Sequence, residues 1–203
     1  MNTIRRRTAT ALAGLAFAGL VLGAAAPAFA ADPVYREFVQ GDPKAKVTVI
    51  EYASLTCPHC AHFAENDFPK LKAEYIDTGK IKFIFRDFPL DGIATAGALL
   101  ARCAPADRGK ILIEVMFKNQ TEWLRSDRPP IERLRDYSKL AGMTDKDVDA
   151  CLKNQKILAT ITEVKDTAVT LYKVESTPTF FVGETKIPGA DYEAVKKAID
   201  KQL

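Results

Sequence analysis

The chain has 203 residues, with 29 Lys or Arg against 26 Asp or Glu, so its formal net charge is +3. Three arginines lie within the first thirty residues, and the rest of the chain is balanced, with 26 basic and 26 acidic residues. This balance excludes the basic surface that nucleic-acid binding requires. The hydrophobic fraction of 47% is ordinary, and after the first thirty residues no apolar run is long enough for a transmembrane helix, so we expect one domain.

The first thirty residues have the pattern of a secretory signal peptide. The arginines at 5–7 precede an uncharged run at 12–22, and small residues at 28 and 30 flank Phe29 before a cleavage site. The apolar run is too short to span a bilayer, although an uncleaved membrane anchor is the alternative. We therefore expect export, to the periplasm or another oxidising compartment, after cleavage near Ala30. All four cysteines lie beyond this point, where disulfides form and persist.

The first strong elements are a strand, a helix and a second strand. Residues 47–52 are rich in Val, Ile and Tyr, which predicts a strand after the Gly-Asp-Pro turn at 41–43. A helical stretch follows Cys57, and Pro69 is expected to kink or restart it. The alternating aromatic run at 81–85 predicts the next strand.

A helical block then separates this unit from the C-terminal elements. Between about 93 and 168 the helical signals are a capping box at Thr144 and Asp147, a helix start at Pro130 and an apolar stripe from Ile157 to Leu171. Strand character returns at 179–182, and residues 192–203 predict a closing helix. The sequence therefore predicts an α/β domain over residues 31–203, interrupted by a helical insertion at about 93–168.

Two cysteines stand where the first helix is predicted to begin, in the motif Cys57-Pro58-His59-Cys60. Unpaired N–H groups and the positive end of the helix dipole favour a thiolate on Cys57, and His59 can add a charge or a hydrogen bond. Pro58 suits the first helical position. Cys60 lies one turn later and is expected to be the buried partner. A stabilised thiolate favours the reduced pair, so the oxidised pair readily donates its disulfide.

Two other interpretations of this motif have to be weighed. Cys57, His59, Cys60 and His62 are all potential zinc ligands, but structural zinc sites take ligands from two separated pairs, and no second pair exists in the sequence. A purely structural disulfide across so short a loop would stabilise the fold little. We expect neither a metal nor a cofactor, and we interpret His62 as a surface residue.

Thr177 and Pro178 stand directly before the predicted strand at 179–182. Proline cannot occupy the interior of a strand's hydrogen-bond ladder. A cis Thr177–Pro178 bond would accommodate it and would leave the Thr177 backbone free to pair with an extended substrate peptide. An ordinary turn with a trans proline is the alternative.

The Cys57-Pro58-His59-Cys60 motif, the Thr177-Pro178 pair and the helical block between them resemble a DsbA-type thiol-disulfide oxidoreductase of the thioredoxin superfamily. The resemblance covers essentially the whole mature chain. It implies a thioredoxin fold with an inserted helical domain and a cis proline beside the active-site sulfurs. It also implies that the protein introduces disulfides into reduced or unfolded exported proteins, is reoxidised by a DsbB-like membrane quinone reductase, and is a monomer.

The same resemblance gives a role to Glu51, six residues before Cys57 in the predicted strand. The family has a buried glutamate near the inner cysteine, so Glu51 would relay a proton to or from Cys60. A solvated Glu51 at the sheet edge is the alternative. Lys82 and Arg86 are the candidates for the family's lysine partner of this glutamate, and neither matches cleanly.

Thr177 departs from the best-known oxidases, which carry an aliphatic residue before the cis proline. Its hydroxyl can tune the thiolate, and several isomerase and reductase relatives have threonine here. The alternative function is therefore a disulfide isomerase or reductase kept reduced by a membrane electron donor. A third is a non-catalytic chaperone or metal-handling protein on the same fold.

Cys103 and Cys151 both have apolar neighbours within the helical block. In an oxidising compartment two buried cysteines are expected to be bonded, and a Cys103–Cys151 disulfide would be structural. Buried free thiols are the alternative. Trp123, the single tryptophan, is interpreted as part of a helix interface.

Overall fold

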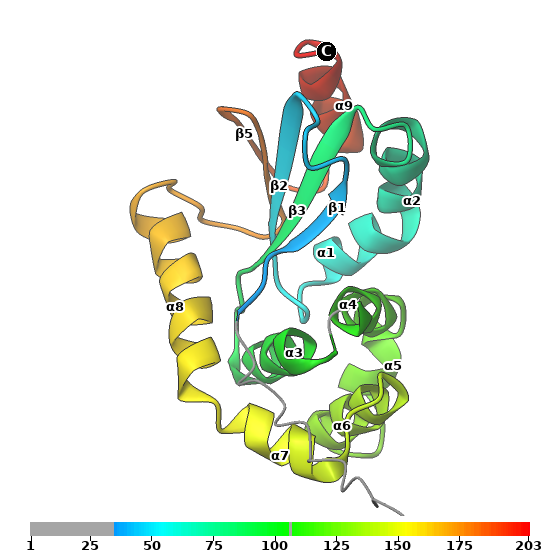
Figure 1. Cartoon of the computed structure of the whole chain (residues 1–203), viewed down its shortest axis with the longest axis vertical. Helices are drawn as coiled ribbons and strands as arrows, with labels where there is room; N and C mark the ends of the chain where they lie inside the picture. The colour runs from blue at the N-terminus through cyan, green and yellow to red at the C-terminus, as the bar shows by residue number, and fades with distance from the viewer. Residues whose placement is uncertain (1–34, 106) are drawn as a thin grey trace, which may run out of the picture. The chain divides into compact units, whose positions relative to one another are not determined.

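The computed structural model describes residues 35–105 and 107–203 (Figure 1). The predicted signal peptide and its cleavage site lie outside the described residues. Within the described part of the chain, no helix is long and apolar enough to cross a membrane. The elements are, in order, β1 (Phe38–Gly41), β2 (Val47–Ala53), α1 (Pro58–His62), η1 (Phe63–Asp67), α2 (Phe68–Leu71), η2 (Lys72–Ile76), β3 (Ile81–Asp87), α3 (Gly92–Cys103), α4 (Arg108–Lys118), α5 (Gln120–Leu124), α6 (Pro130–Leu140), α7 (Asp145–Leu152), α8 (Gln155–Thr170), β4 (Thr179–Val182), β5 (Thr185–Pro188) and α9 (Tyr192–Asp200).

The strands form one mixed sheet in the order β1-β3-β2-β4-β5. β2 and β3 run parallel, joined through the helical stretch that follows Cys57, and the other neighbouring pairs are antiparallel. β2 lies at the centre because it is apolar along both faces, as a strand covered on two sides must be. The cysteine motif begins just beyond its C-terminal end.

Helices cover both faces of this sheet (Figure 1). On one face, Phe63 of η1 packs on Phe180 of β4, with 4.5 Å between ring centroids, and Phe68 of α2 packs on Phe83 of β3 at 5.0 Å. On the other face, Ala168 of α8 belongs to a separate buried cluster with Tyr52, Phe88 and Val174. The sheet is thus the middle layer of three, with α3–α7 lying beyond its end where β2 and β3 finish.

The helical stretch from 58 to 76 changes direction between α1 and α2, and the α-helical segment α2 begins at Phe68 with Pro69 in its first turn (Figure 1). The stretch continues through two π-helical segments, η1 and η2, on either side of α2. Proline lacks the N–H that a regular turn would use, and a wider turn accommodates this without ending the helix. The N–H of Phe68 accordingly bonds to the carbonyl of Phe63, five residues earlier. The predicted restart at Pro69 is therefore confirmed, within a stretch that stays helical.

Other elements also differ from those predicted. The segment before Gly41 is the strand β1, which pairs antiparallel with β3 and takes the sheet's edge. Thr185–Pro188 forms a further edge strand. The stripe on α8 ends before Leu171, which is 71% exposed, and α9 ends at Asp200 instead of Leu203. The edge strands are four residues long, too short to give a clear alternation in the sequence.

α3 is the centre of the helical block, contacting α4, α6, α7 and α8. Its Arg102 side chain is fully buried, with Nε 2.7 Å from the Asp87 Oδ2 atom of β3 and the guanidinium over the Phe38 ring of β1. The next residue, Cys103, forms a disulfide with Cys151 of α7. α3 is therefore tied to the sheet by an ion pair and to the rest of the block by a covalent bond.

Removing the Cys103–Cys151 disulfide should destabilise the fold without changing the Cys57-Pro58-His59-Cys60 motif. The bond closes a loop with a sequence separation of 48, so the double change C103A/C151A should lower the free energy of unfolding by about 4 kcal/mol, because the unfolded chain regains entropy. Urea unfolding followed by circular dichroism measures this, with Cys57 and Cys60 changed to Ser in both proteins so that no disulfide can rearrange. A loss of less than about 1 kcal/mol would show that the loop entropy is offset elsewhere.

Candidate active site

Cys57 is positioned by the turn that joins β2 to α1. It is the N-cap residue of α1, with extended backbone angles, and Pro58 follows at the first helical position. The Cys57 N–H bonds to the Ser54 carbonyl at 3.1 Å, which fixes the turn. The residue is 5% exposed, and its thiol donates to the Thr177 carbonyl at 3.3 Å. A residue 120 positions later in the chain thus contacts the first sulfur directly.

The surroundings of Cys57 favour its ionised form. A hydrogen bond from the Cys60 thiol, the Thr177 side chain and the backbone N–H groups of Cys60 and His59 together lower the pKa of Cys57 from its usual 9.0 to about 5, against the opposing effect of burial. In the structure both cysteines are free thiols. At neutral pH the reduced protein therefore holds Cys57 as a thiolate.

Cys60 has the opposite character, and Glu51 lies close to it. Cys60 is fully buried, and burial, followed by the nearby Cys57 and Glu51, raises the pKa of its thiol. Glu51 on β2 is 4% exposed, and burial followed by the charge on Cys57 raises the pKa of its carboxyl to about 8. The Glu51 Oε1 atom has no hydrogen-bond partner among the described residues. Glu51 is therefore a buried carboxyl that can exchange a proton near neutral pH, not a solvated one.

Neither Lys82 nor Arg86 is a partner of Glu51. Side chains alternate between faces along a strand, and the registry places Glu51 opposite Phe85, so Lys82 and Arg86 project from the other face of β3. Arg86 instead bonds to Glu37 at 2.7 Å and to the Tyr52 hydroxyl at 3.0 Å. Among the described residues, the basic side chain that lines the same cavity as Glu51 is Lys110 of α4.

The peptide bond between Thr177 and Pro178 is cis, the form that the sequence analysis favoured over a trans turn. It brings the Thr177 carbonyl to Cys57, while the Thr177 N–H makes no backbone hydrogen bond to a described residue. The Thr177 hydroxyl is buried, and its one polar interaction with a described residue is the one that lowers the pKa of Cys57. Both groups are therefore available, the hydroxyl to the sulfur and the N–H to an extended chain.

His59 of the motif and His62, two residues after it, have exposed side chains. His59 influences Cys57 through its backbone N–H, and no hydrogen bond or ion pair from its imidazole reaches a described residue. His62 lies 4.0 Å from the Asp67 carboxylate at the surface. Within the described ranges no three His, Cys, Asp or Glu side chains gather as metal ligands do.

Comparison with known proteins identifies the chain. The family model described as "Thioredoxin" matches residues 34–201. In solved structures, the chain is similar to alpha-DsbA1 of Wolbachia pipientis, with a TM-score of 0.76 and 31% identity over 84% of this chain and 92% of that one. This chain belongs to the thioredoxin family and is a DsbA-type member of it. The predicted fold and the predicted family resemblance are confirmed.

Curated relatives of this DsbA-type protein are named for disulfide chemistry. A candidate protein-disulfide oxidoreductase of Rickettsia prowazekii (strain Madrid E) is 35% identical over 172 residues, which are 82% of this chain and 61% of that protein. Disulfide bond formation protein D of Bacillus subtilis (strain 168) is 28% identical over 190 residues, 81% of this chain and 76% of that one. The chain thus spans about three fifths of the length of its Rickettsia relative.

One functional contact that the sequence did not reveal comes from Gln120 of α5. Its side chain is buried, and its Nε2 donates to the Leu55 carbonyl at 2.8 Å and to the Cys57 carbonyl at 2.9 Å. The helical block thus holds the cysteine turn through one amide. No local pattern in the sequence could predict this, because the contact joins residues 63 and 65 positions apart.

A second contact joins the same turn to α3. Asp91, the N-cap of α3, accepts from the Ala94 N–H at 2.7 Å with one oxygen and from the Thr56 hydroxyl at 2.7 Å with the other. Ser54, beside Thr56, accepts from the Leu90 N–H at 3.2 Å. The sequence can suggest Asp91 as a helix N-cap, but it cannot show that the loop before α3 lies beside the loop that follows β2. The Thr56–Asp91 hydrogen bond was therefore not predictable from the sequence.

A spectroscopic titration should show the low pKa of Cys57. The absorbance of the thiolate in the ultraviolet, measured on the reduced protein, should rise with a midpoint near pH 5, and Cys57→Ser should abolish that step. A step near pH 9 would contradict the thiolate assignment.

The same shift has a consequence for stability. Folded reduced protein loses the Cys57 proton that its unfolded chain keeps until pH 9, so its free energy of unfolding gains a contribution as pH rises from 5 to 9. The raised pKa of Glu51 works the opposite way between 4.5 and about 8, and the larger cause of that shift, burial, is common to both redox states. The free energy of unfolding can be measured by urea titration at several pH values, once for the reduced protein and once for the oxidised protein. The value for the reduced protein minus the value for the oxidised protein should increase from pH 5 to pH 9. A decrease would contradict the assignment.

Removing the Gln120 amide should loosen the cysteine turn. Gln120→Leu leaves the buried Leu55 carbonyl without a donor, at a cost of about 2 kcal/mol in unfolding free energy. Thr121→Ala, an exposed change on the same helix, is the matched control and should cost less than about 0.5 kcal/mol. Equal effects of the two changes would show that the amide contact is not stabilising.

Proposed function

We propose that this DsbA-type protein is a thiol-disulfide oxidoreductase that introduces disulfide bonds into exported proteins by exchange at Cys57 and Cys60. The observation that carries the proposal is the asymmetry of the two sulfurs. One lies at a helix start with a pKa lowered to about 5, and the other is fully buried with a raised pKa. A low-pKa sulfur is a good leaving group, and its stable thiolate makes the disulfide form an oxidant.

The exchange proceeds in two steps. A substrate thiolate attacks the Cys57 sulfur of the oxidised protein, the Cys57–Cys60 bond breaks, and Cys60 leaves as a thiolate that takes a proton from Glu51. A second substrate thiolate then attacks the substrate sulfur of the mixed disulfide, so the substrate disulfide forms and the Cys57 thiolate leaves. The free Thr177 N–H supports pairing with an extended substrate during both steps.

The location and partners belong to the same proposal. The signal-peptide pattern at residues 1–30 supports export, and the oxidised Cys103–Cys151 pair suits an oxidising compartment. The reduced protein needs an oxidant to complete the cycle, and a DsbB-like membrane quinone reductase fits that need. The substrates are reduced, unfolded exported proteins, and the protein acts as a monomer.

Thr177 favours a second candidate, a disulfide isomerase or reductase. Its buried hydroxyl beside Cys57 stabilises the thiolate that an isomerase must present to wrong disulfides. Refolding of scrambled ribonuclease measures isomerase activity, and insulin reduction measures reductase activity. Turnover in these assays that exceeds oxidation of a reduced peptide substrate would favour this candidate.

The equilibrium of the Cys57–Cys60 pair with glutathione tests the oxidase proposal. The pair should be clearly more oxidising than the roughly −270 mV typical of thioredoxins, as followed by mass spectrometry of alkylated protein. His59→Ala should lower the potential if the imidazole supports the thiolate, and no change would remove that side chain from the mechanism. A wild-type potential at the thioredoxin value would contradict oxidase function.

A further inference from the structure

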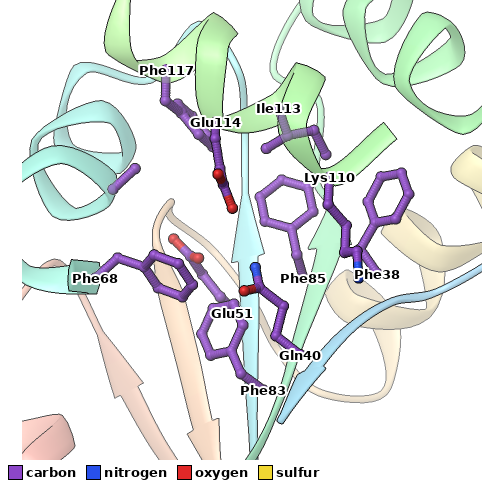
Figure 2. A pocket seen from close by; sticks show the side chains of 11 residues that line it. Phe38, Gln40, Glu51, Phe68, Phe83, Phe85, Lys110, Ile113, Glu114 and Phe117 are labelled. Carbon is purple, nitrogen blue, oxygen red and sulfur yellow. The ribbon is translucent and has the colours of Figure 1, made fainter. Parts of the chain in front are cut away.

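Glu51 does not only face the sulfurs; it also lines a cavity of about 40 Å³ between the sheet and α4. Aromatic side chains and four polar ones surround this space (Figure 2). The polar side chains are Glu51 of β2, Gln40 of β1, and Lys110 and Glu114 of α4. Neither cysteine lines the cavity. The cavity thus connects the buried carboxyl to the helical block, apart from the sulfurs that substrate must reach.

The cavity is suited to hold water. A water molecule needs about 10–15 Å³ of such volume and two or more polar partners, so there is room for about three waters. An all-aromatic cavity would stay dry, but here the Oε1 atom of Glu51 is buried and lacks a partner among the described residues. Bound water would satisfy this oxygen, because leaving it alone costs free energy.

The polar side chains of the cavity are arranged in space from the protein interior to its surface. Figure 2 shows the Glu114 carboxylate pointing from α4 toward that of Glu51, with the Gln40 amide beside the space between them. Glu51 is buried, Gln40 is half-buried and Glu114 is exposed. Neither Glu114 nor Lys110 makes an ion pair or hydrogen bond to another described residue, so the Glu114 carboxylate is available to accept and release protons.

We propose that Glu114 is the outer proton-transfer residue of the exchange reaction, passing protons between bulk solvent and Glu51 through water in this cavity. The inference rests on the proposed function. When Cys60 resolves a mixed disulfide at Cys57, it gives its proton to Glu51, its sulfur bonds to Cys57, and the bond from Cys57 to the partner sulfur breaks so that the partner leaves as a thiolate. The proton then leaves Glu51 for Glu114 and bulk water. When a substrate thiolate expels Cys60 from Cys57, the proton moves the opposite way.

The surrounding charges are consistent with this direction of transfer. The titratable groups that face Glu51 are Cys57 and Cys60 from the cysteine turn and α1, and Glu114 and Lys110 from α4. The Cys57 thiolate raises the pKa of Glu51 and so holds its proton. When Cys57 is bonded to substrate, that charge is gone and Glu51 releases its proton more readily.

Resolution of a mixed disulfide tests the inference, because it requires deprotonation of Cys60. Reduced protein is mixed with saturating oxidised glutathione at neutral pH, and the limiting unimolecular rate at which Cys60 displaces glutathione from Cys57 is measured by quenching and mass spectrometry. Glu114→Gln should slow this step by about fivefold, less than the roughly 10²–10⁴-fold of a group that transfers the proton directly to the reacting atom, because Glu114 acts through water and Glu51. Glu65→Gln removes another exposed carboxylate, in η1 after α1, that does not line the cavity, and it should leave the rate within about twofold.

Two further readouts separate proton transfer from a structural effect. A relay changes the forward and reverse rates together, so the equilibrium with glutathione should be unchanged in Glu114→Gln. Added formate, a small carboxylic acid, should restore the rate of Glu114→Gln, and Glu114→Asp should keep most of it. Equal rates in Glu114→Gln and Glu65→Gln, or a loss that formate does not restore, would overturn the relay while leaving the oxidoreductase proposal intact. A wild-type protein that fails to form the mixed disulfide would overturn both.

Discussion

The Cys57 sulfur can carry a negative charge in a nearly buried position only because donors surround it. Burial alone would favour the neutral thiol, and the hydrogen bonds from the Cys60 thiol and from the start of α1 reverse that preference. This charge raises the pKa of Glu51 behind it. In the proposed exchange, it also makes Cys57 the sulfur that leaves the mixed disulfide and favours the reduced pair.

Three distant parts of the chain hold the cysteine turn in place. The cis Thr177–Pro178 segment places a carbonyl 3.3 Å from the sulfur, Gln120 holds the carbonyls on either side of Thr56, and Asp91 holds the Thr56 side chain. The inserted helices supply two of these three contacts. The insertion is therefore part of the site and not only a cover over the end of the sheet. It also contributes the α4 side chains that line the cavity behind Glu51.

The sequence was sufficient for those features that depend on local spacing. The cysteine motif at a helix start, the strands predicted at 47–52 and 179–182, and the capping box at Thr144 all follow from short-range patterns. Features that depend on which face of a strand or helix packs against another element were harder to predict from the sequence. Lys82 and Arg86 alternate with Phe83 and Phe85 along β3, so the period of two already placed them away from the apolar face to which Glu51 belongs. Gln120 could not be found from sequence, since its role arises only when α5 packs against the cysteine turn.

Trp123 lies one turn after Gln120 on α5, is fully buried, and donates its indole N–H to the Met116 carbonyl at 2.7 Å. It is the only tryptophan of the chain. The intrinsic tryptophan fluorescence of this protein therefore has a single origin, in the helix that contacts the cysteine turn. The wavelength of its emission maximum therefore reports on whether α5 is packed against its neighbours. Fluorescence can follow the inserted helices in this way, independently of the sheet, during disulfide exchange.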